Sequence, residues 1–389
     1  MIKTVKEIEI ENKKVIIRCD FNVPIENKKI IDDTRIKESL ETIRYCLNKN
    51  CKIILMSHLG RVKEEKDLKK NDLKIVAECL SKLLKKEVFF INETRGKKLE
   101  EKVKNMKEKE IILIQNTRYE ELEGKKESQN DAELAKYWAN LGEIFINDAF
   151  ATVHRTHASN VGIASHLPHG IGLLIKKELE HLDELKCPKK PFIVILGGKK
   201  VADKIGVIKN LAPKVDYLVI GGGMAFTFLK ADGYNIGKSI IDEENISFCK
   251  EMLEKYEEKI VLPVDIKTNN EFKNEGTIKI KDITNIEEND YGLDIGPKSI
   301  ENFKNIIKKS QTVFWNGPLG VYEFDNFKIA TDTLLKYITK NKIKTILGGG
   351  DILAAAKKAG VEKNIYYTST GGGATLEYLE GKNLPGLME

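Results

Sequence analysis

The sequence lacks long hydrophobic runs, clustered cysteines and a concentrated basic stripe. Its longest apolar stretches, such as 192–196, last five or six residues, far below the roughly 20 that a membrane-spanning helix needs. The six cysteines form no Cys-x-x-Cys pair, which argues against a disulfide framework or a zinc site. The formal charge is only +6, and lysines alternate with acids in runs such as 63–67. We therefore expect neither membrane insertion nor nucleic-acid binding.

Targeting signals and repeats are also missing. The basic residues near the start, Lys3 and Lys6, are followed by no apolar segment and no small-residue cleavage site, so we expect no signal peptide and a cytoplasmic location. We find no fixed-period repeat. Hydrophobic residues make up 41% and charged residues 32% of 389 residues, a composition typical of compact proteins and a length that favours two domains.

Short apolar runs alternate with amphipathic stretches along the whole chain. The expected strands are 14–18, 52–56, 111–114 and 144–146 in the first half, and 192–196, 217–220, 312–315 and 345–347 in the second. Continuous apolar strands separated by helices are typical of parallel sheets covered on both faces. The sequence therefore predicts an α/β fold with two doubly wound, Rossmann-like parallel-sheet domains joined by an interdomain helix.

A polar stretch at 168–170 gives way to a helical pattern that starts at Leu173 and is predicted to run to Cys187–Pro188. We take this helix as the connector. The expected parts are an N-terminal domain over 1–169, an interdomain helix and hinge over 170–186, and a C-terminal domain over 187–374. In such sheets ligands bind where strands end and helices begin.

Neither standard nucleotide fingerprint is present. The segment 233–239 is one residue short of a P-loop, and no G-x-G-x-x-G opens a helix, so a P-loop ATPase and a Rossmann dehydrogenase are both disfavoured. We interpret 233–239 as a surface loop. Triple glycines instead occur at 221–223, 348–350 and 371–373, each between a predicted strand and a predicted helix. One such triplet is usually a flexible turn, but three together favour a phosphate site lined by backbone N–H groups.

Charged residues adjoin these glycines. Lys200 and Lys204 follow the strand that ends at Leu196, and a spacing of four would place them on one helix face. Lysines are usually only solvated, so the neighbouring glycines carry this hypothesis. Asp351 follows the second triplet and offers a hard oxygen ligand for Mg²⁺, although an isolated aspartate there would more often cap a helix.

The first half carries arginines that we expect at strand ends. They are Arg18, Arg35, Arg61, Arg118 and Arg155. Any one arginine is usually part of a surface ion pair, but five together predict a site for a small, doubly anionic substrate, because the guanidinium fork binds phosphate or carboxylate through paired hydrogen bonds. The histidines have no metal-ligand spacing, and His58 suits phosphate hydrogen bonding better.

Seven segments carry the motifs of a known family in order. They are RCDFNVP at 18–24, SHLGR at 57–61, DAF at 148–150 with HRTH at 154–157, LGGKKVADK at 196–204, GGGMAFTF at 221–228, WNGPLG at 315–320 and STGGGA at 369–374. Through them the sequence resembles phosphoglycerate kinase from end to end. The resemblance implies reversible phosphoryl transfer between 1,3-bisphosphoglycerate and MgADP, giving 3-phosphoglycerate and MgATP in glycolysis or gluconeogenesis. It also implies two lobes joined by a helix, with the C-terminal segment 375–389 returning to the first lobe.

The resemblance further implies which residues contact the substrates. Those expected to bind 3-phosphoglycerate or its 1-phosphorylated form are Asp20, Phe21, Asn22, Arg35, His58, Leu59, Gly60, Arg61, Arg118 and Arg155. Those expected to bind ADP or ATP are Gly198, Lys200, Lys204, Gly222, Gly223, Gly292, Asn316, Glu323, Gly349, Gly350, Asp351 and Ile352, with Glu323 at the ribose and Asp351 on Mg²⁺. The residues expected to take part in catalysis are Arg35, Lys200, Gly371, Gly372 and Gly373.

The sequence departs from the family pattern at two positions. Lys199 stands where the family usually has alanine, which adds a positive charge beside the nucleotide site. Ile352 stands where the family usually has serine or threonine, which removes a hydroxyl group. Ile352 is the one argument for the alternative of a catalytically silent nucleotide-binding scaffold. We expect a monomer that closes its two lobes around the substrates, because substrates held on separate lobes must meet away from water.

Overall fold

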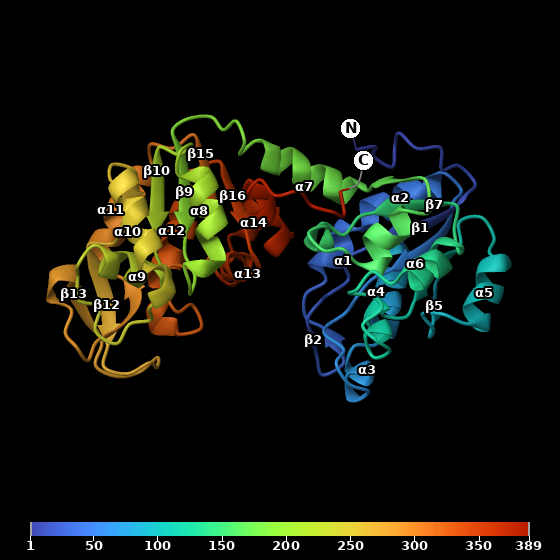
Figure 1. Cartoon of the computed structure of the whole chain (residues 1–389), viewed down its shortest axis with the longest axis horizontal. Helices are drawn as coiled ribbons and strands as arrows, with labels where there is room; N and C mark the ends of the chain where they lie inside the picture. The colour runs from blue at the N-terminus through green and yellow to red at the C-terminus, as the bar shows by residue number, and fades with distance from the viewer. Residues whose placement is uncertain (1, 388–389) are drawn as a thin grey trace. The chain divides into compact units, whose positions relative to one another are not determined.

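The computed structural model describes residues 2–387, which belong to two compact units (Figure 1). The first contains the chain up to Glu180 together with the segment from Asn383, and the second runs from His181 to Lys382. The division falls inside helix α7, Leu173–Asp183. This helix is shorter than predicted, because the chain turns at its end, with Lys186 N donating to the carbonyl of Asp183.

The core of the first unit is a six-stranded sheet in the order β5-β6-β4-β1-β7-β8, and all neighbouring strands are parallel. Its strands are β1 (Lys14–Arg18), β4 (Lys52–Met56), β5 (Val88–Ile91), β6 (Ile111–Ile114), β7 (Ile144–Asn147) and β8 (His169–Ile171). A small antiparallel pair, β2 (Ile25–Glu26) and β3 (Lys29–Ile30), lies outside this sheet.

Helices cover both faces of this sheet, and the alternation of buried side chains along the strands shows it. Val15 and Ile17 of β1 pack in one cluster with residues of α2 (Leu40–Asn48) and α4 (Lys74–Leu84). Ile16, between them, packs in another with residues of α5 (Lys97–Lys104) and α6 (Ala132–Ala139). Because successive side chains of a strand point to opposite faces, the sheet is apolar on both sides. Two short helices, α1 (Thr34–Glu38) and α3 (Lys66–Lys70), complete the unit.

The second unit has the same architecture. Its six strands, in the order β11-β10-β9-β15-β16-β17, are again all parallel. They are β9 (Phe192–Leu196), β10 (Tyr217–Ile220), β11 (Ile260–Val261), β15 (Thr312–Asn316), β16 (Thr345–Gly348) and β17 (Tyr367–Ser369). The helices are α8 (Ile205–Leu211), α9 (Met224–Ala231), α10 (Ile246–Lys255), α11 (Pro297–Ile307), α12 (Ile329–Lys340), α13 (Gly350–Lys358) and α14 (Gly373–Leu379).

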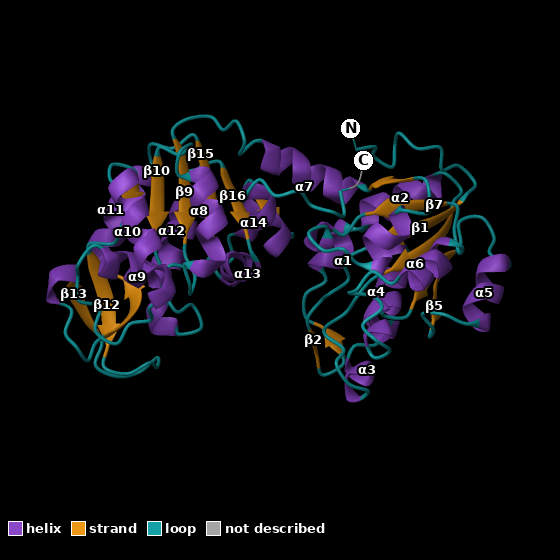
Figure 2. Cartoon of the chain, in the orientation of Figure 1, coloured by secondary structure: helices purple, strands orange, loops and turns teal. Residues whose placement is uncertain are grey.

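A second sheet in this unit was not predicted. Strand β12 (Asp265–Asn269) pairs antiparallel with both β13 (Lys279–Asp282) and β14 (Tyr291–Ile295), and Figure 2 shows β12 and β13 beside the main sheet rather than in it. Polar residues such as Lys267 and Thr268 interrupt the apolar pattern of β12, so the sequence carries no strong strand signal here.

The C-terminal segment belongs to the first unit from Asn383 onward, later than the predicted start at 375. Gly386 anchors it, because its N–H donates to the carbonyl of Val153 at 2.7 Å and its own carbonyl accepts from Asn147 Nδ2 at 3.0 Å. Residues 388–389 of the predicted segment lie outside the described residues.

The predicted fold class is confirmed, because all eight expected strands are present and lie in two parallel sheets with helices between them. Within residues 2–387, no helix is both long enough and apolar enough to cross a membrane.

Candidate functional site

The predicted substrate residues of the first unit come together at one edge of its sheet. Strands β6, β4 and β1 are adjacent and parallel, so the loops after their carboxyl ends meet. These loops carry Asp20 and Asn22 after β1, the segment 57–61 after β4, and Arg118 after β6. The strand order of the sheet therefore brings motifs that are distant in the sequence into one cluster.

Hydrogen bonds join these loops through Gly60. Its N–H donates to Asn22 Oδ1 at 2.8 Å, and its carbonyl accepts from the Arg118 guanidinium. Gly60 has φ +61°, and an added Cβ would lie 2.0 Å from Asn71 Oδ1, so only glycine fits this turn. Arg35 forms an ion pair with Asp20, whose carboxylate also accepts from Asn22 N at 3.1 Å.

The cluster is strongly cationic, and His58 at its centre is buried. Burial, followed by the charges of four arginines, lowers the pKa of His58 well below its ordinary value; these arginines are Arg18, Arg118, Arg35 and Arg155. Burial, followed by the charges of nearby arginines, lowers the pKa of His157 to about 3. Both imidazoles are therefore neutral at pH 7 in the protein without substrate.

A cavity of about 570 Å³ opens beside this cluster. The residues that line it are Arg61, Val62, Lys63, Arg118, Glu121, Lys125, Ser128, Arg155 and His157. Three of the predicted arginines are therefore in one cavity. Lys63 and Lys125 were missed, because they resemble the many exposed lysines of this chain and no local pattern separates them.

Two of the five arginines differ from the prediction. Arg18 ends β1 but is only 1% exposed, and its guanidinium contacts Ser159, Cys19 and His58 inside the unit. Arg35 lies in helix α1 rather than at a strand end. The prediction of five equivalent forks was wrong for Arg18, because its side chain turns from the strand into the protein interior.

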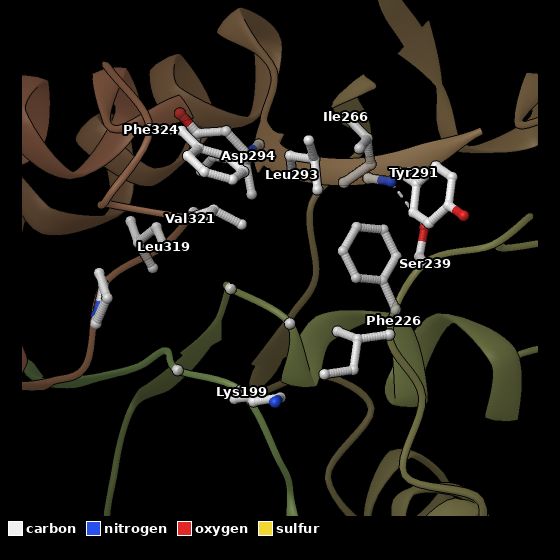
Figure 3. A pocket seen from close by; sticks show the side chains of 18 of the residues that line it. Lys199, Phe226, Ser239, Ile266, Tyr291, Leu293, Asp294, Leu319, Val321 and Phe324 are labelled. Atoms are coloured by element: carbon white, nitrogen blue, oxygen red, sulfur yellow. Dashed lines mark hydrogen bonds between the residues drawn. The ribbon is translucent and has the colours of Figure 1, made fainter. Parts of the chain in front are cut away.

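The second unit contains a larger cavity, of about 640 Å³ (Figure 3). Of the predicted nucleotide residues, Gly198, Gly222, Gly223, Gly292, Glu323 and Asp351 line it. Gly222 has φ +63°, and an added Cβ would lie 2.6 Å from Gly198 N. The two glycine loops therefore contact each other through their backbones, which a side chain would prevent.

One part of this cavity is apolar. Phe226, Leu293, Leu319, Val321 and Phe324 surround the space in Figure 3. Leu293 and the neighbouring Gly292 come from β14, in the sheet that the sequence did not reveal. Such a surface accepts the flat face of a heterocyclic base.

The polar residues at the ends of β15 and β16 gather around Asn316. This asparagine is 2% exposed, accepts a hydrogen bond from Lys204 Nζ and donates one to the carbonyl of Gly348. Burial lowers the pKa of Lys204, whereas the nearby carboxylates of Asp203 and Asp351 raise it. Asp351 itself is exposed in the first turn of α13, where the positive end of the helix dipole and its free N–H groups favour anions.

The three triple glycines lie at strand-to-helix junctions as predicted: 221–223 lies between β10 and α9, 348–350 spans the end of β16 and the start of α13, and 371–373 follows β17 and includes the start of α14. The predicted shared helix face of Lys200 and Lys204 was wrong. Lys200 precedes the 3₁₀ turn Ala202–Lys204, and α8 begins only at Ile205.

Further details differ from the sequence analysis. The loop 233–239 is not only surface, because Lys238 and Ser239 line the cavity, and the Ser239 hydroxyl accepts from Gly292 N at 2.9 Å. The side chains of Phe21, Leu59 and Ile352 are buried in the cores, so only their backbones can face a ligand. Lys199 lines the cavity.

The described residues contain no group of three or more His, Cys, Asp or Glu side chains that could hold a metal ion by themselves. A metal ion bound to these residues would therefore need ligands besides their His, Cys, Asp and Glu side chains. Mg²⁺ is commonly held in this way, by one or two carboxylates together with substrate phosphates and water.

Comparisons with known proteins agree with this geometry. The sequence model of the family described as phosphoglycerate kinase matches residues 5–382. A phosphoglycerate kinase of Fusobacterium nucleatum is 51% identical, covering 100% of this chain and 98% of that protein, and one of Staphylococcus aureus is 51% identical over 99% and 98%.

Solved structures agree as well. The phosphoglycerate kinase of Coxiella burnetii has a TM-score of 0.87 at 38% identity, covering 100% of this chain and 98% of that one. The phosphoglycerate kinase of Pyrococcus horikoshii has a TM-score of 0.84 at 30% identity, with coverages of 98% and 97%. Since a family model and close relatives both span essentially the whole sequence, this chain belongs to the phosphoglycerate kinase family.

Proposed function

We propose that this phosphotransferase holds 3-phosphoglycerate, or its 1-phosphorylated form, on the first unit through the arginine cluster. The observation that carries this proposal is the gathering of Arg61, Arg118 and Arg155 around one cavity. Arg35 belongs to the same cluster, because its charge is among those that lower the pKa of His58, after burial, Arg18 and Arg118. The substrate carries a carboxylate and a phosphate, and guanidinium groups bind both through paired, charge-assisted hydrogen bonds.

ADP or ATP would occupy the cavity of the second unit. Its apolar part, with Phe226 and Leu293, suits the base, and the exposed carboxylate of Glu323 suits the ribose hydroxyls. The phosphates would then lie toward Lys204 and the first turn of α13. We assign Lys200 to the phosphates as well, because it is exposed and follows Gly198 and Lys199, which line the cavity.

Asp351 suits a Mg²⁺ ion that arrives with the nucleotide. It is an exposed carboxylate at the polar end of the cavity, beside Lys204 and the free N–H groups of α13. Asp351 would hold the ion beside the phosphates, where its charge would neutralise that of the phosphate oxygens. Asp351 would orient the ion, and the lysines would hold the remaining phosphate oxygens.

The reaction itself needs positioning and electrostatic stabilisation more than proton transfer. The attacking group is either a carboxylate or a phosphate oxygen, so no general base is required, and the transition state spreads charge over three equatorial oxygens. We assign Arg35 and Lys200 to these oxygens, together with backbone N–H groups at 371–373. The two substrates must meet in line, so we infer a closure of the two units with its hinge within 170–186, which would also keep water from the acyl phosphate.

A coupled assay with 3-phosphoglycerate and MgATP tests this proposal. We expect turnover that requires both substrates and Mg²⁺. Separate titrations should show that 3-phosphoglycerate binds to the chain without nucleotide and that MgADP binds without 3-phosphoglycerate. Binding of both without turnover would indicate a catalytically silent scaffold, for which the comparisons give no support. We further propose that the enzyme is a monomer, because residues of one chain line each of the two cavities; sedimentation velocity tests the oligomeric state. We also propose a cytoplasmic location, because its six cysteines are free thiols, as is usual in a reducing compartment.

A further inference from the structure

A continuous line of buried, hydrogen-bonded polar side chains leads to His58 in the arginine cluster. Glu127 Oε1 accepts from the Ser159 hydroxyl at 2.5 Å, Ser159 Oγ accepts from Arg18 Nε at 2.8 Å, and Arg18 NH2 lies 3.3 Å from His58 Nδ1. Glu127 and Ser159 are 0% exposed, Arg18 1% and His58 5%. His157 joins the line at its far end, with Nδ1 at 3.7 Å from Glu127 Oε1.

The backbone fixes this line in place. Arg18 is the last residue of β1, and His58 follows the neighbouring strand β4. Ser159 lies in the π-helical turn Ala158–Gly162, and its N–H donates to Glu127 Oε2 at 3.0 Å. The carbonyl of Glu127 accepts from Ala158 N at 2.9 Å. Glu127 is therefore held at three points and can move little.

The direction of each hydrogen bond follows from donor chemistry. A guanidinium group only donates, so Ser159 Oγ must accept from Arg18 and give its own hydrogen to Glu127. His58 Nδ1 must likewise accept from Arg18. A neutral imidazole that accepts at Nδ1 carries its proton at Nε2. His58 therefore presents an N–H donor from Nε2.

We propose that Glu127 is a positioning residue which, through Ser159 and Arg18, holds neutral His58 in the Nε2–H tautomer as a hydrogen-bond donor to the anionic substrate. This inference rests on the substrate site proposed above and adds to it the residues that orient His58. The low pKa of His58, caused by burial and the surrounding arginines, supports a neutral ring. Glu127 also supplies the strongest of the negative charges that favour the buried Arg18 guanidinium, followed by Asp20.

Nitrogen-15 NMR of the imidazole rings tests the tautomer directly. The resonances of His58 are assigned by their loss in His58→Gln. In the wild-type protein at pH 7 we expect a protonated Nε2 and an unprotonated Nδ1 at His58. A wild-type ring protonated at Nδ1 would overturn the proposal, and this measurement needs neither substrate nor turnover. It therefore remains informative even if the coupled assay shows no activity.

Two variants test the role of the line, and a third controls for burial. Glu127→Gln keeps the shape but removes the charge, and Ser159→Ala removes the bridge. The matched control is Glu120→Gln, because Glu120 is also a buried glutamate held by a hydroxyl, from Thr94, and by an arginine, Arg95, and neither partner belongs to the line that ends at His58.

We expect both test variants to raise KM for 3-phosphoglycerate by about tenfold, the loss of roughly one charge-assisted hydrogen bond, and to leave KM for MgATP within about twofold. Their His58 spectra should show mixed tautomers. The control should leave both KM values and the His58 spectrum unchanged. The proposal would be refuted if the test variants lost thermal stability as Glu120→Gln does but kept the wild-type tautomer and the wild-type KM for 3-phosphoglycerate. That result would show that the line is only structural.

Discussion

Replacing Arg35 with alanine is the most direct test of the proposed transition-state contacts. In the protein without substrate, Arg35 pairs with Asp20, whose side chain is 5% exposed against 32% for Arg35. Loss of the guanidinium leaves that carboxylate with the Asn22 N–H, which should cost about 1 kcal/mol of folding stability, since the pair is partly open to solvent. The protein should therefore still fold.

The effect on turnover should be much larger. If Arg35 makes two charge-assisted hydrogen bonds to the migrating phosphoryl group, at about 1.5–3 kcal/mol each, their loss should lower kcat by roughly a hundredfold to ten-thousandfold. Affinity for MgADP should change little, because the proposed nucleotide contacts come from the second unit. Arg35→Lys should recover only part of the activity, since lysine keeps the charge but lacks the planar fork.

Steady-state kinetics and calorimetric titration with MgADP measure these two quantities. Arg44→Ala is a matched control, because Arg44 is an exposed arginine of the same unit whose guanidinium, among residues 2–387, donates to the carbonyl of Leu83 alone. We expect that control to behave like the wild type. Equal losses of kcat and MgADP affinity in Arg35→Ala, or a loss of kcat below about tenfold, would refute the proposed role.

Three further predictions concern the nucleotide cavity and the buried carboxylates. Lys199→Ala should weaken ATP binding about two- to fivefold at low salt, with the difference vanishing at high ionic strength; a titration in which salt leaves the difference unchanged would exclude an electrostatic role. Asp351→Asn should weaken binding of MgADP while leaving metal-free ADP unaffected, as calorimetry can measure, and an equal loss for both would remove Asp351 from the metal. Burial raises the pKa of Asp148 to about 8, so the folded state binds more protons than the unfolded one between about pH 4 and 8 and its stability should fall as pH rises through this window. In thermal melts, the melting temperature should fall less with rising pH for Asp148→Asn than for the wild type. Equal pH dependence in the two proteins would contradict the raised pKa of Asp148.

Much of the fold could be predicted because parallel strands have a strong local signal. A strand such as β9, with Phe192 to Leu196 all buried, is apolar along its whole length since helices cover both faces of the sheet. The antiparallel strand β12 lacks this signal, because polar and apolar residues mix along it. The sequence analysis therefore missed a sheet whose strand β14 supplies Gly292 and Leu293 to the nucleotide cavity.

Site residues divided in a similar way. Glycine triplets and arginine motifs could be recognised from the sequence because they recur, whereas a single triplet or a single arginine would have been ambiguous. Lys125 and Lys238 could not, because a lysine that lines a cavity has the same local sequence as one that faces water. Arg18 was wrongly predicted to face a ligand, because nothing in the local sequence shows that a charged side chain at a strand end turns into the protein interior.

The sequence by itself determined the fold class, the family and the set of chemical groups that we propose to meet the substrates, because these depend on residue type and order along the chain. Only the tertiary structure decided which groups are buried, which line a cavity and which hold one another. The hydrogen-bonded line Glu127–Ser159–Arg18–His58 joins residues up to 141 positions apart in the sequence. Burial and hydrogen-bond direction at such distances arise from packing, which no local pattern encodes.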